Sequence, residues 1–171
     1  MLTPKLLAAL NQQINEEYYS SYLYRAMVAW FESTNLDGCA HWMRMQADEE
    51  HLHALKIFNY VLDRGGKVEL KAVKAPPAEW DNPLAAFEAA LDHEKFMTAS
   101  ISKLADLAID EKDHATNNVM QWYVSEQVEE EAQVDDIVNK LRLVGQDGPG
   151  LFMIDRELKA RMAPVNPDGI V

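Results

Sequence analysis

The chain has 171 residues, of which 48% are hydrophobic and 26% charged, so one ordered domain over residues 1–171 is expected. Its net charge of −12, without a lysine or arginine cluster, argues against nucleic acid or an anionic membrane surface as partner. Cys39 is the single cysteine, which excludes an intrachain disulfide, and no apolar run reaches the ~20 residues of a membrane span. No signal-peptide pattern opens the sequence, so a cytoplasmic location is expected.

Apolar residues recur at helical spacing in five segments, and caps such as Thr3-Pro4 mark where helices begin. The segments cover about residues 4–33, 37–64, 83–110, 114–144 and 150–162. The short connections between the first two and between the next two require antiparallel hairpins. The eighteen residues of 65–82 lack a helical period. They reach up to about 60 Å when extended, whereas a 28-residue helix is about 42 Å long. We therefore predict an all-α four-helix bundle with one long crossover and a short fifth C-terminal helix.

Six polar residues occupy inward positions of the four long helices, where apolar side chains are expected. They are Glu17, Glu50, His53, Glu94, Gln127 and Glu130. Adding 77 to the first three positions gives the last three, so the pattern occurs twice. In an antiparallel hairpin, residues at equal depth have a constant sum of positions. The midpoints of Glu17–Glu50 and Glu94–Gln127, 33.5 and 110.5, both fall inside the predicted turns, which places the six residues in one buried layer.

Burying several ionised carboxylates in one layer costs several kcal/mol each unless a cation is present. No arginine or lysine lies in the four helix seams at this depth, so metal cations are predicted. Carboxylates with one imidazole suit iron or manganese, with zinc as a competitor. Because residues three apart share a helix face, Glu50 can bridge two ions while His53 binds one of them.

On this geometry one ion is held by Glu17, Glu50 and His53. The other is held by Glu50, Glu94 and Glu130. Gln127 is a weaker neutral ligand, or it hydrogen-bonds bound water or oxygen. Taken singly, each of these residues is more often a solvated residue of a helix surface; it is their joint spacing that favours a metal site.

Three stretches resemble bacterial non-haem ferritins: residues 15–21, residues 49–53 and, most specifically, the run QWYVSEQVEEE at 121–131. The resemblance implies a ferritin-like fold, a ferroxidase centre and a hollow homo-oligomeric shell of 24 subunits that stores ferric mineral. By position it assigns as ferroxidase ligands Glu17, Glu50, His53, Glu94 and Glu130, with Gln127 beside them. It implies a third iron site from Glu49, Glu126, Glu129 and the shared Glu130. It also places Tyr24 and Trp122 next to the centre.

Related families differ at identifiable residues. Bacterioferritins carry a second E-x-x-H where this chain has Gln127 and Glu130, and their haem-binding methionine corresponds to a position near Leu52, so no haem is expected. An acidic stripe is the simplest alternative for the third site, and a core aromatic for Tyr24. Surface positions, not ligand roles, are expected for His41, His51, His93 and His114. Candidates for an iron access channel at a subunit junction are Asp110, Glu111 and Asp113.

The sequence thus predicts an iron-storage protein with ferroxidase activity, in which dioxygen or peroxide oxidises Fe(II) at a di-iron centre within each subunit. The first alternative is a di-metal carboxylate oxidase or peroxidase that does not store iron. A structural or cytokine-like bundle with outward-facing carboxylates is the second, and a cation buffer without turnover is the third.

Overall fold

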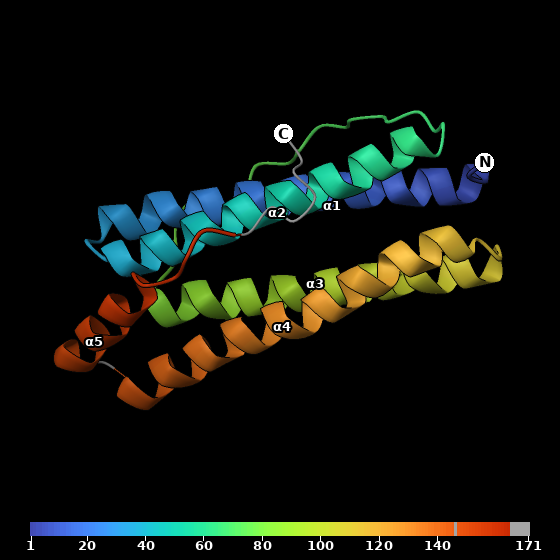
Figure 1. Ribbon diagram of the computed structural model, residues 1–171. Helices are drawn as coiled ribbons and strands as arrows, with labels where there is room; N and C mark the ends of the chain where they lie inside the picture. The colour runs from blue at the N-terminus through green and yellow to red at the C-terminus, as the bar shows by residue number, and fades with distance from the viewer. Residues whose placement is uncertain (146, 165–171) are drawn as a thin grey trace.

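The computed structural model describes residues 1–145 and 147–164, and within them the chain forms five α-helices and no strand. These are α1 (Pro4–Ser33), α2 (Asp37–Asp63), α3 (Pro83–Asp110), α4 (His114–Val144) and α5 (Gly148–Leu158). The predicted all-α four-helix bundle with a long crossover and a short fifth helix is confirmed (Figure 1). Gln146 and residues 165–171, which the predicted domain includes, lie outside the described part. No described helix combines the length and the apolar character needed to cross a membrane.

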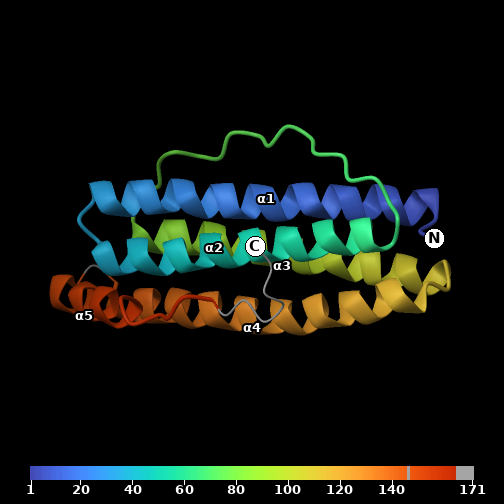
Figure 2. The same cartoon turned by 45° about the horizontal axis from the view of Figure 1, so that its top comes forward.

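The topology follows from the connections. α1 packs antiparallel to α2, and α3 antiparallel to α4 (Figure 1). The crossover returns along α1 for the length of the bundle, so that α2 and α3 run in the same direction (Figure 2). Asn11 of α1 fastens the crossover: its Nδ2 donates to the carbonyl of Lys67 at 3.0 Å, and its Oδ1 accepts from the amide of Glu69 at 2.8 Å.

Local sequence signals fix the helix ends. The side chains of Thr3, Asn82 and Asp113 accept from backbone amides in the first turns of α1, α3 and α4, which satisfies donors that have no partner within the helix. In the two hairpin turns, Asn35 and Lys112 adopt left-handed backbone angles, with φ of 59° and 55°. The tight turns hold the hairpins in the register that the position sums predict.

The hydrophobic core is divided into two clusters. One cluster, with Tyr24, Phe31 and Phe87 among its members, fills the end of the bundle next to α5. The other, with Ile57 and Tyr123, fills the opposite end. Between them lie buried polar side chains, namely Gln13, Glu17, Ser20, Gln46, Glu50, His53, Glu94, Gln127 and Glu130. Such a layer weakens the hydrophobic core, so it requires compensation by hydrogen bonds or bound cations.

The fifth helix differs from its prediction at both ends. It begins at Gly148, two residues earlier than expected, because Asp147 caps it through the amide of Gly150 at 2.8 Å. It ends at Leu158 and not at Met162, so residues 159–164 leave the helix and turn back along the bundle (Figure 2). α2 likewise ends at Asp63, one residue before its prediction.

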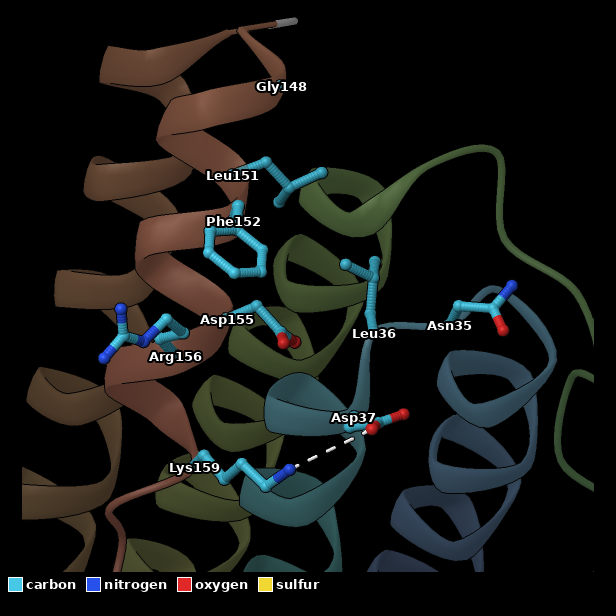
Figure 3. Close-up of a pocket in the computed structure, with 9 residues that line it drawn as sticks. All are labelled: Asn35, Leu36, Asp37, Gly148, Leu151, Phe152, Asp155, Arg156 and Lys159. Carbon is cyan, nitrogen blue, oxygen red and sulfur yellow. Dashed lines mark ion pairs between the residues drawn. The ribbon is translucent and has the colours of Figure 1, made fainter.

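Helix α5 docks on the start of α2 through a hydrogen bond from backbone to side chain and a close approach of the two backbones. Leu36, the N-cap of α2, provides no side-chain hydrogen bond, and Asp155 of α5 accepts from the amide of Cys39 at 2.9 Å instead. Gly38 permits this approach, since a Cβ there would lie 1.7 Å from the carbonyl oxygen of Asp155. A shallow pocket with a volume of about 500 Å³ lies beside the contact, and the Lys159–Asp37 ion pair at 3.9 Å borders it (Figure 3).

Candidate metal centre

The structure brings the six polar residues predicted from the spacing into one buried layer. α1 contributes Glu17, α2 contributes Glu50 and His53, and α3 contributes Glu94. α4 contributes Gln127 and Glu130. None of the six is more than 4% exposed, so they are core residues and not a solvated stripe.

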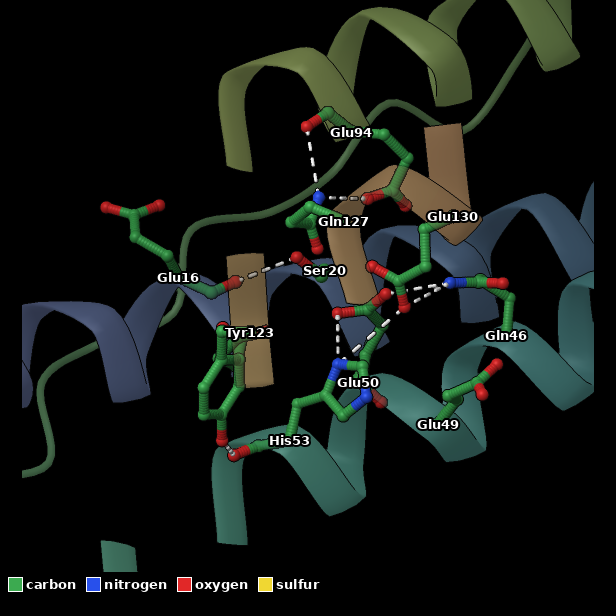
Figure 4. Close-up of polar contacts among 12 residues, drawn as sticks. Glu16, Ser20, Gln46, Glu49, Glu50, His53, Glu94, Tyr123, Gln127 and Glu130 are labelled. Carbon is green, nitrogen blue, oxygen red and sulfur yellow. Dashed lines mark hydrogen bonds and ion pairs between the residues drawn. The ribbon is translucent and has the colours of Figure 1, made fainter. Parts of the chain in front are cut away.

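Five of these side chains form two overlapping groups. In each group, one ligand atom from every member lies within 4.8 Å of the others. One group consists of Glu17, Glu50 and His53, and the other of Glu50, Glu94 and Glu130. Glu50 belongs to both groups, which is the arrangement expected if its carboxylate bridges two ions (Figure 4). Each group offers oxygen atoms or oxygen with one imidazole nitrogen, a donor set that suits iron.

Amide side chains orient the carboxylates. Gln13 donates to Glu17 at 2.9 Å. Gln46 donates to Glu50 at 2.9 Å and to Glu130 at 3.3 Å. The amide nitrogen of Gln127 donates to a carboxylate oxygen and to the backbone carbonyl of Glu94, both at 3.2 Å (Figure 4), and its role as a neutral ligand stays a prediction.

Sequence reasoning assigned no role to Gln13 and Gln46, although a signal is present. Each of them stands four residues before a ligand carboxylate, Glu17 or Glu50, and therefore on the same helix face. The two positions are again 33 residues apart. Read together with the ligands, this spacing predicts an outer ring of hydrogen-bond donors, which fixes ligand orientation around a metal site.

One carboxylate oxygen in the layer has no partner. Among the described residues, Glu130 Oε2 is buried and accepts no hydrogen bond. Buried polar atoms are nearly always satisfied in folded proteins, and leaving one unsatisfied costs about 1–3 kcal/mol. An unsatisfied oxygen that faces other carboxylates indicates that a cation completes the layer.

The carboxylates of the layer have higher pKa values than exposed carboxylates, so they take up protons more readily. Burial raises the pKa of Glu17 and of Glu94 to about 7 in each case. Burial, together with the neighbouring carboxylates, holds the pKa values of Glu50 and Glu130 well above their usual range. Burial lowers the pKa of His53 to about 4, so its imidazole is neutral at pH 7 and can offer a lone pair to a metal ion. Binding of cations must therefore release protons from the carboxylates.

Aromatic side chains surround the layer. Tyr24 donates a hydrogen bond from its hydroxyl to Glu94, as its predicted place beside the centre requires. Trp122 packs edge-on against the imidazole of His53 with 5.3 Å between ring centroids. Tyr123 donates to the carbonyl of His53 at 2.8 Å. These contacts fix the imidazole ring and the backbone that carries it.

His93 is not the surface residue that we expected. It is only partly exposed, its Nε2 lies 2.7 Å from the hydroxyl of Ser20, and it packs against Tyr19 and Phe96. Burial lowers its pKa to about 4. Because His93 is the residue next to Glu94 on α3, its side chain points in a different direction from the ligand. It lies in the contact between α1 and α3.

The residues of the predicted third site lie on one side of this layer. Glu49 and Glu126 are partly buried, Glu129 is exposed, and burial and mutual repulsion raise the pKa values of Glu49 and Glu126. Within residues 1–145 and 147–164, their carboxylates do not gather as closely as those of the two central groups. Arg161, from the segment after α5, pairs with Glu49 at 2.6 Å. The third site stays a prediction.

The access channel predicted near the α3–α4 turn also stays a prediction. Asp113 has a structural role there: its carboxylate caps α4 and receives two hydrogen bonds from Arg64, at 2.7 and 3.0 Å. This pairing holds the pKa of Asp113 far below its usual range. Asp110 is exposed and Glu111 is partly exposed at the same end of the bundle.

Comparison with known sequences decides the family. The profile of the ferritin-like domain matches residues 7–144, which contain α2, α3, α4, all of α1 but its first three residues, and every residue of the central groups. The chain belongs to the ferritin family. Among its ferritin relatives, the bacterial non-heme ferritin of Escherichia coli is 40% identical over 158 residues, which cover 92% of this chain and 96% of that protein. That of Campylobacter jejuni is 40% identical over 159 residues, covering 93% and 95%.

Solved ferritin structures share the whole fold. An open-pore ferritin from the archaeon Archaeoglobus fulgidus superposes with a TM-score of 0.94 and 52% identity, covering 95% of this chain and all of that one. A closed form engineered from the same ferritin gives a TM-score of 0.94 and 51% identity, covering 96% and 100%. The predicted resemblance to non-haem ferritins is thereby confirmed over nearly the full length of the chain.

Proposed function

We propose that this ferritin oxidises Fe(II) at the paired site in its bundle and stores the ferric product in a shell built from copies of itself. The observation that carries the proposal is the pair of buried ligand groups that share Glu50. Two ions bound on either side of one carboxylate are close enough to deliver electrons to the same oxidant molecule. Dioxygen or peroxide is the acceptor that we propose, and each Fe(II) ion gives up one electron.

The side chains contribute charge, orientation and proton release. Glu17, Glu50, Glu94 and Glu130 offset the charge of the incoming ions, and the raised pKa values mean that ion binding displaces protons to solvent. Carboxylates also stabilise the more highly charged ferric product better than the ferrous substrate. Because Glu130 keeps one oxygen free of hydrogen bonds, it can change its mode of binding without breaking a protein contact.

Gln127 and Tyr24 act on the same carboxylate. Both donate hydrogen bonds to Glu94, one from an amide and one from a phenol hydroxyl. We propose that they hold the Glu94 carboxylate toward the second ion and leave its partner group, Glu130, as the adjustable ligand.

Glu49, Glu126 and Glu129 are proposed to receive a third ion beside Glu130, and the 24-subunit shell is proposed from the resemblance to ferritins.

Replacing Glu50 by alanine tests the proposal. Because mutations in residues that merely orient metal ligands cost 10- to 100-fold, loss of a ligand shared by two ions should slow Fe(II)-dependent oxygen uptake by at least about 100-fold. Stopped-flow oxygen consumption after mixing metal-free protein with Fe(II) measures this. Glu79→Ala is the matched control, since Glu79 is exposed on the crossover. An E50A protein that oxidises iron like E79A and wild type would falsify the assignment and favour a structural bundle.

Iron loading separates storage from the alternative of a di-metal oxidase or peroxidase. A storage protein retains hundreds or more ferric ions per particle after aerobic addition of Fe(II), whereas an oxidase without storage retains only the ions in its ligand groups. Particle mass and iron content, measured on the same gel-filtration peak, give the result. Stoichiometric binding without oxygen uptake would instead identify a cation buffer.

A further inference from the structure

The segment after α5 reaches the metal layer from outside the four helices. We call residues 159–164 the C-terminal strap. It leaves α5 at the end of the bundle and turns back between α2 and α4 (Figure 2). Its backbone is held at Arg161, whose carbonyl oxygen lies 2.8 Å from His41 Nε2 on α2. The guanidinium that Arg161 carries lies beside Glu49, one residue before the ligand Glu50.

Within the described part of the chain, the Arg161 side chain makes hydrogen bonds and a cation–π contact with α2. Its Nη2 donates to Glu49 Oε2 at 2.6 Å and to Gln46 Oε1 at 2.8 Å. Its Nη1 donates to the carbonyl of Trp42 at 3.3 Å, and its guanidinium lies over the Trp42 ring, 4.2 Å from the centroid. The side chain is only 15% exposed, so the ion pair with Glu49 is screened far less than a surface pair.

Gln46 links this contact to the paired ligand groups. Its oxygen accepts from Arg161, so its amide nitrogen must face the other way, where it donates to Glu50 and Glu130 (Figure 4). Arg161 thus fixes the orientation of an amide that contacts the bridging carboxylate and the carboxylate shared with the proposed third site. Glu49 lies on the same helix, one residue before Glu50.

We propose that Arg161 occupies Glu49 as a built-in cation until a third iron ion displaces it, and that it thereby sets how tightly the third site binds. The inference rests on the proposed function. An arginine keeps its charge at any pH at which the protein is folded, so it competes with iron for Glu49 at all times. A third ion must break a short charge-assisted hydrogen bond before it can use the same oxygen.

Competition of this kind makes the third site the weakest of the three. Glu17, Glu50 and Glu94 accept hydrogen bonds from neutral glutamine amides, whereas Glu49 is already paired with a charged guanidinium. Iron is therefore expected to fill the paired site first. A weakly held third ion can leave again, which suits a position between the paired site and the stored mineral.

Metal titration of the full-length, metal-free protein tests the proposal. Zn²⁺ is the probe, because it binds carboxylate and imidazole without redox chemistry, and calorimetry resolves its successive binding steps. Wild type is expected to bind two ions tightly and a third more weakly. In R161A the third step should tighten by at least about tenfold, since a charge-assisted hydrogen bond no longer competes for Glu49. R161Q, which loses the charge but keeps a long polar side chain, should tighten it similarly.

Two further variants assign the effect to Glu49. R156A removes one positive charge from an exposed position of α5 and should leave all three steps unchanged. E49Q should abolish the third step, and R161A in the E49Q background should restore nothing. The proposal is overturned if the third step in R161A and R161Q stays as weak as in wild type or becomes weaker. Absence of the two tight steps from wild type would refute the proposed function itself, which is a separate result.

Discussion

At the scale of single residues, Glu130 carries the strongest indication that the buried layer binds a cation. One of its oxygens accepts from Gln46 at 3.3 Å, and the other is buried without a hydrogen bond among the described residues. Burial, and after it the neighbouring carboxylates, hold its pKa well above the usual range, so in the metal-free protein its charge is a cost to folding. The ionised form of the Glu130 carboxylate is also the form that binds a metal ion.

Replacing Glu130 by glutamine should separate stability from metal binding. Metal-free E130Q should be more stable than wild type at pH 8 by about 1–2 kcal/mol, because a buried charge without a partner is removed. Its stabilisation by added Zn²⁺ should fall, since one ligand of the second group is lost. Guanidinium unfolding with and without Zn²⁺ measures both effects, with E79Q as the exposed control. A metal-free E130Q less stable than wild type contradicts this account of the layer.

At the scale of elements, α5 and the strap are held by contacts that are distant in sequence. Asp155 of α5 caps α2 through the amide of Cys39, and Gly38 gives the two backbones room to approach. Arg161 then reaches Trp42, Gln46 and Glu49 on the same helix. Helix α2 therefore holds α5 in place and also binds the guanidinium that lies beside the buried polar layer.

Gly38→Ala should loosen this docking. Alanine usually favours a helix over glycine by about 1 kcal/mol, but a Cβ at this position would lie 1.7 Å from the Asp155 carbonyl oxygen, so α5 must move. We expect faster amide hydrogen exchange in α5 and a net destabilisation of about 1–3 kcal/mol. Gly148→Ala is the matched control, because nothing lies within 4 Å of a Cβ there. Unchanged exchange in G38A would show that α5 does not depend on the contact.

At the scale of the whole molecule, an acidic layer separates two hydrophobic clusters. The layer bears on the pH dependence of stability, since carboxylates with raised pKa values bind more protons in the folded chain than in the unfolded one. Between the ordinary value of 4.5 and about 7, this difference makes folding less favourable as pH rises. His53 and His93, each with a pKa lowered to about 4, act in the opposite direction between pH 4 and 6.5, but they are two groups against four.

The metal-free protein should therefore be more stable near pH 5 than near pH 8, and divalent cations should reverse this order. Cations bind the ionised carboxylates, so they stabilise the fold most where protons are absent. Thermal unfolding at fixed protein concentration, at both pH values and with or without Zn²⁺, tests this. The pH difference should shrink in E130Q. Metal-free protein that gains stability steadily from pH 5 to pH 8 is incompatible with a buried acidic layer.

The sequence by itself determined the four long helices, their pairing and which residues form the buried polar layer. Helical periodicity and cap residues are local, so the helix positions can be read from them, and short turns fix the depth of Glu17, Glu50, Glu94 and Gln127 through position sums. The resemblance to non-haem ferritins rests on the same residues, and the comparisons confirm the family.

Tertiary structure alone decided the surroundings of that layer. Helix α5 ends at Leu158, earlier than its periodicity predicts. Two contacts join segments that are more than 100 residues apart in the sequence: the close approach of Gly38 to Asp155, and the ion pair of Arg161 with Glu49. No lysine or arginine was expected in the four helix seams at this depth, and the guanidinium beside Glu49 comes from the strap, which has no helical period. Periodicity records which face of a helix is buried; it does not record which distant segment packs against that face.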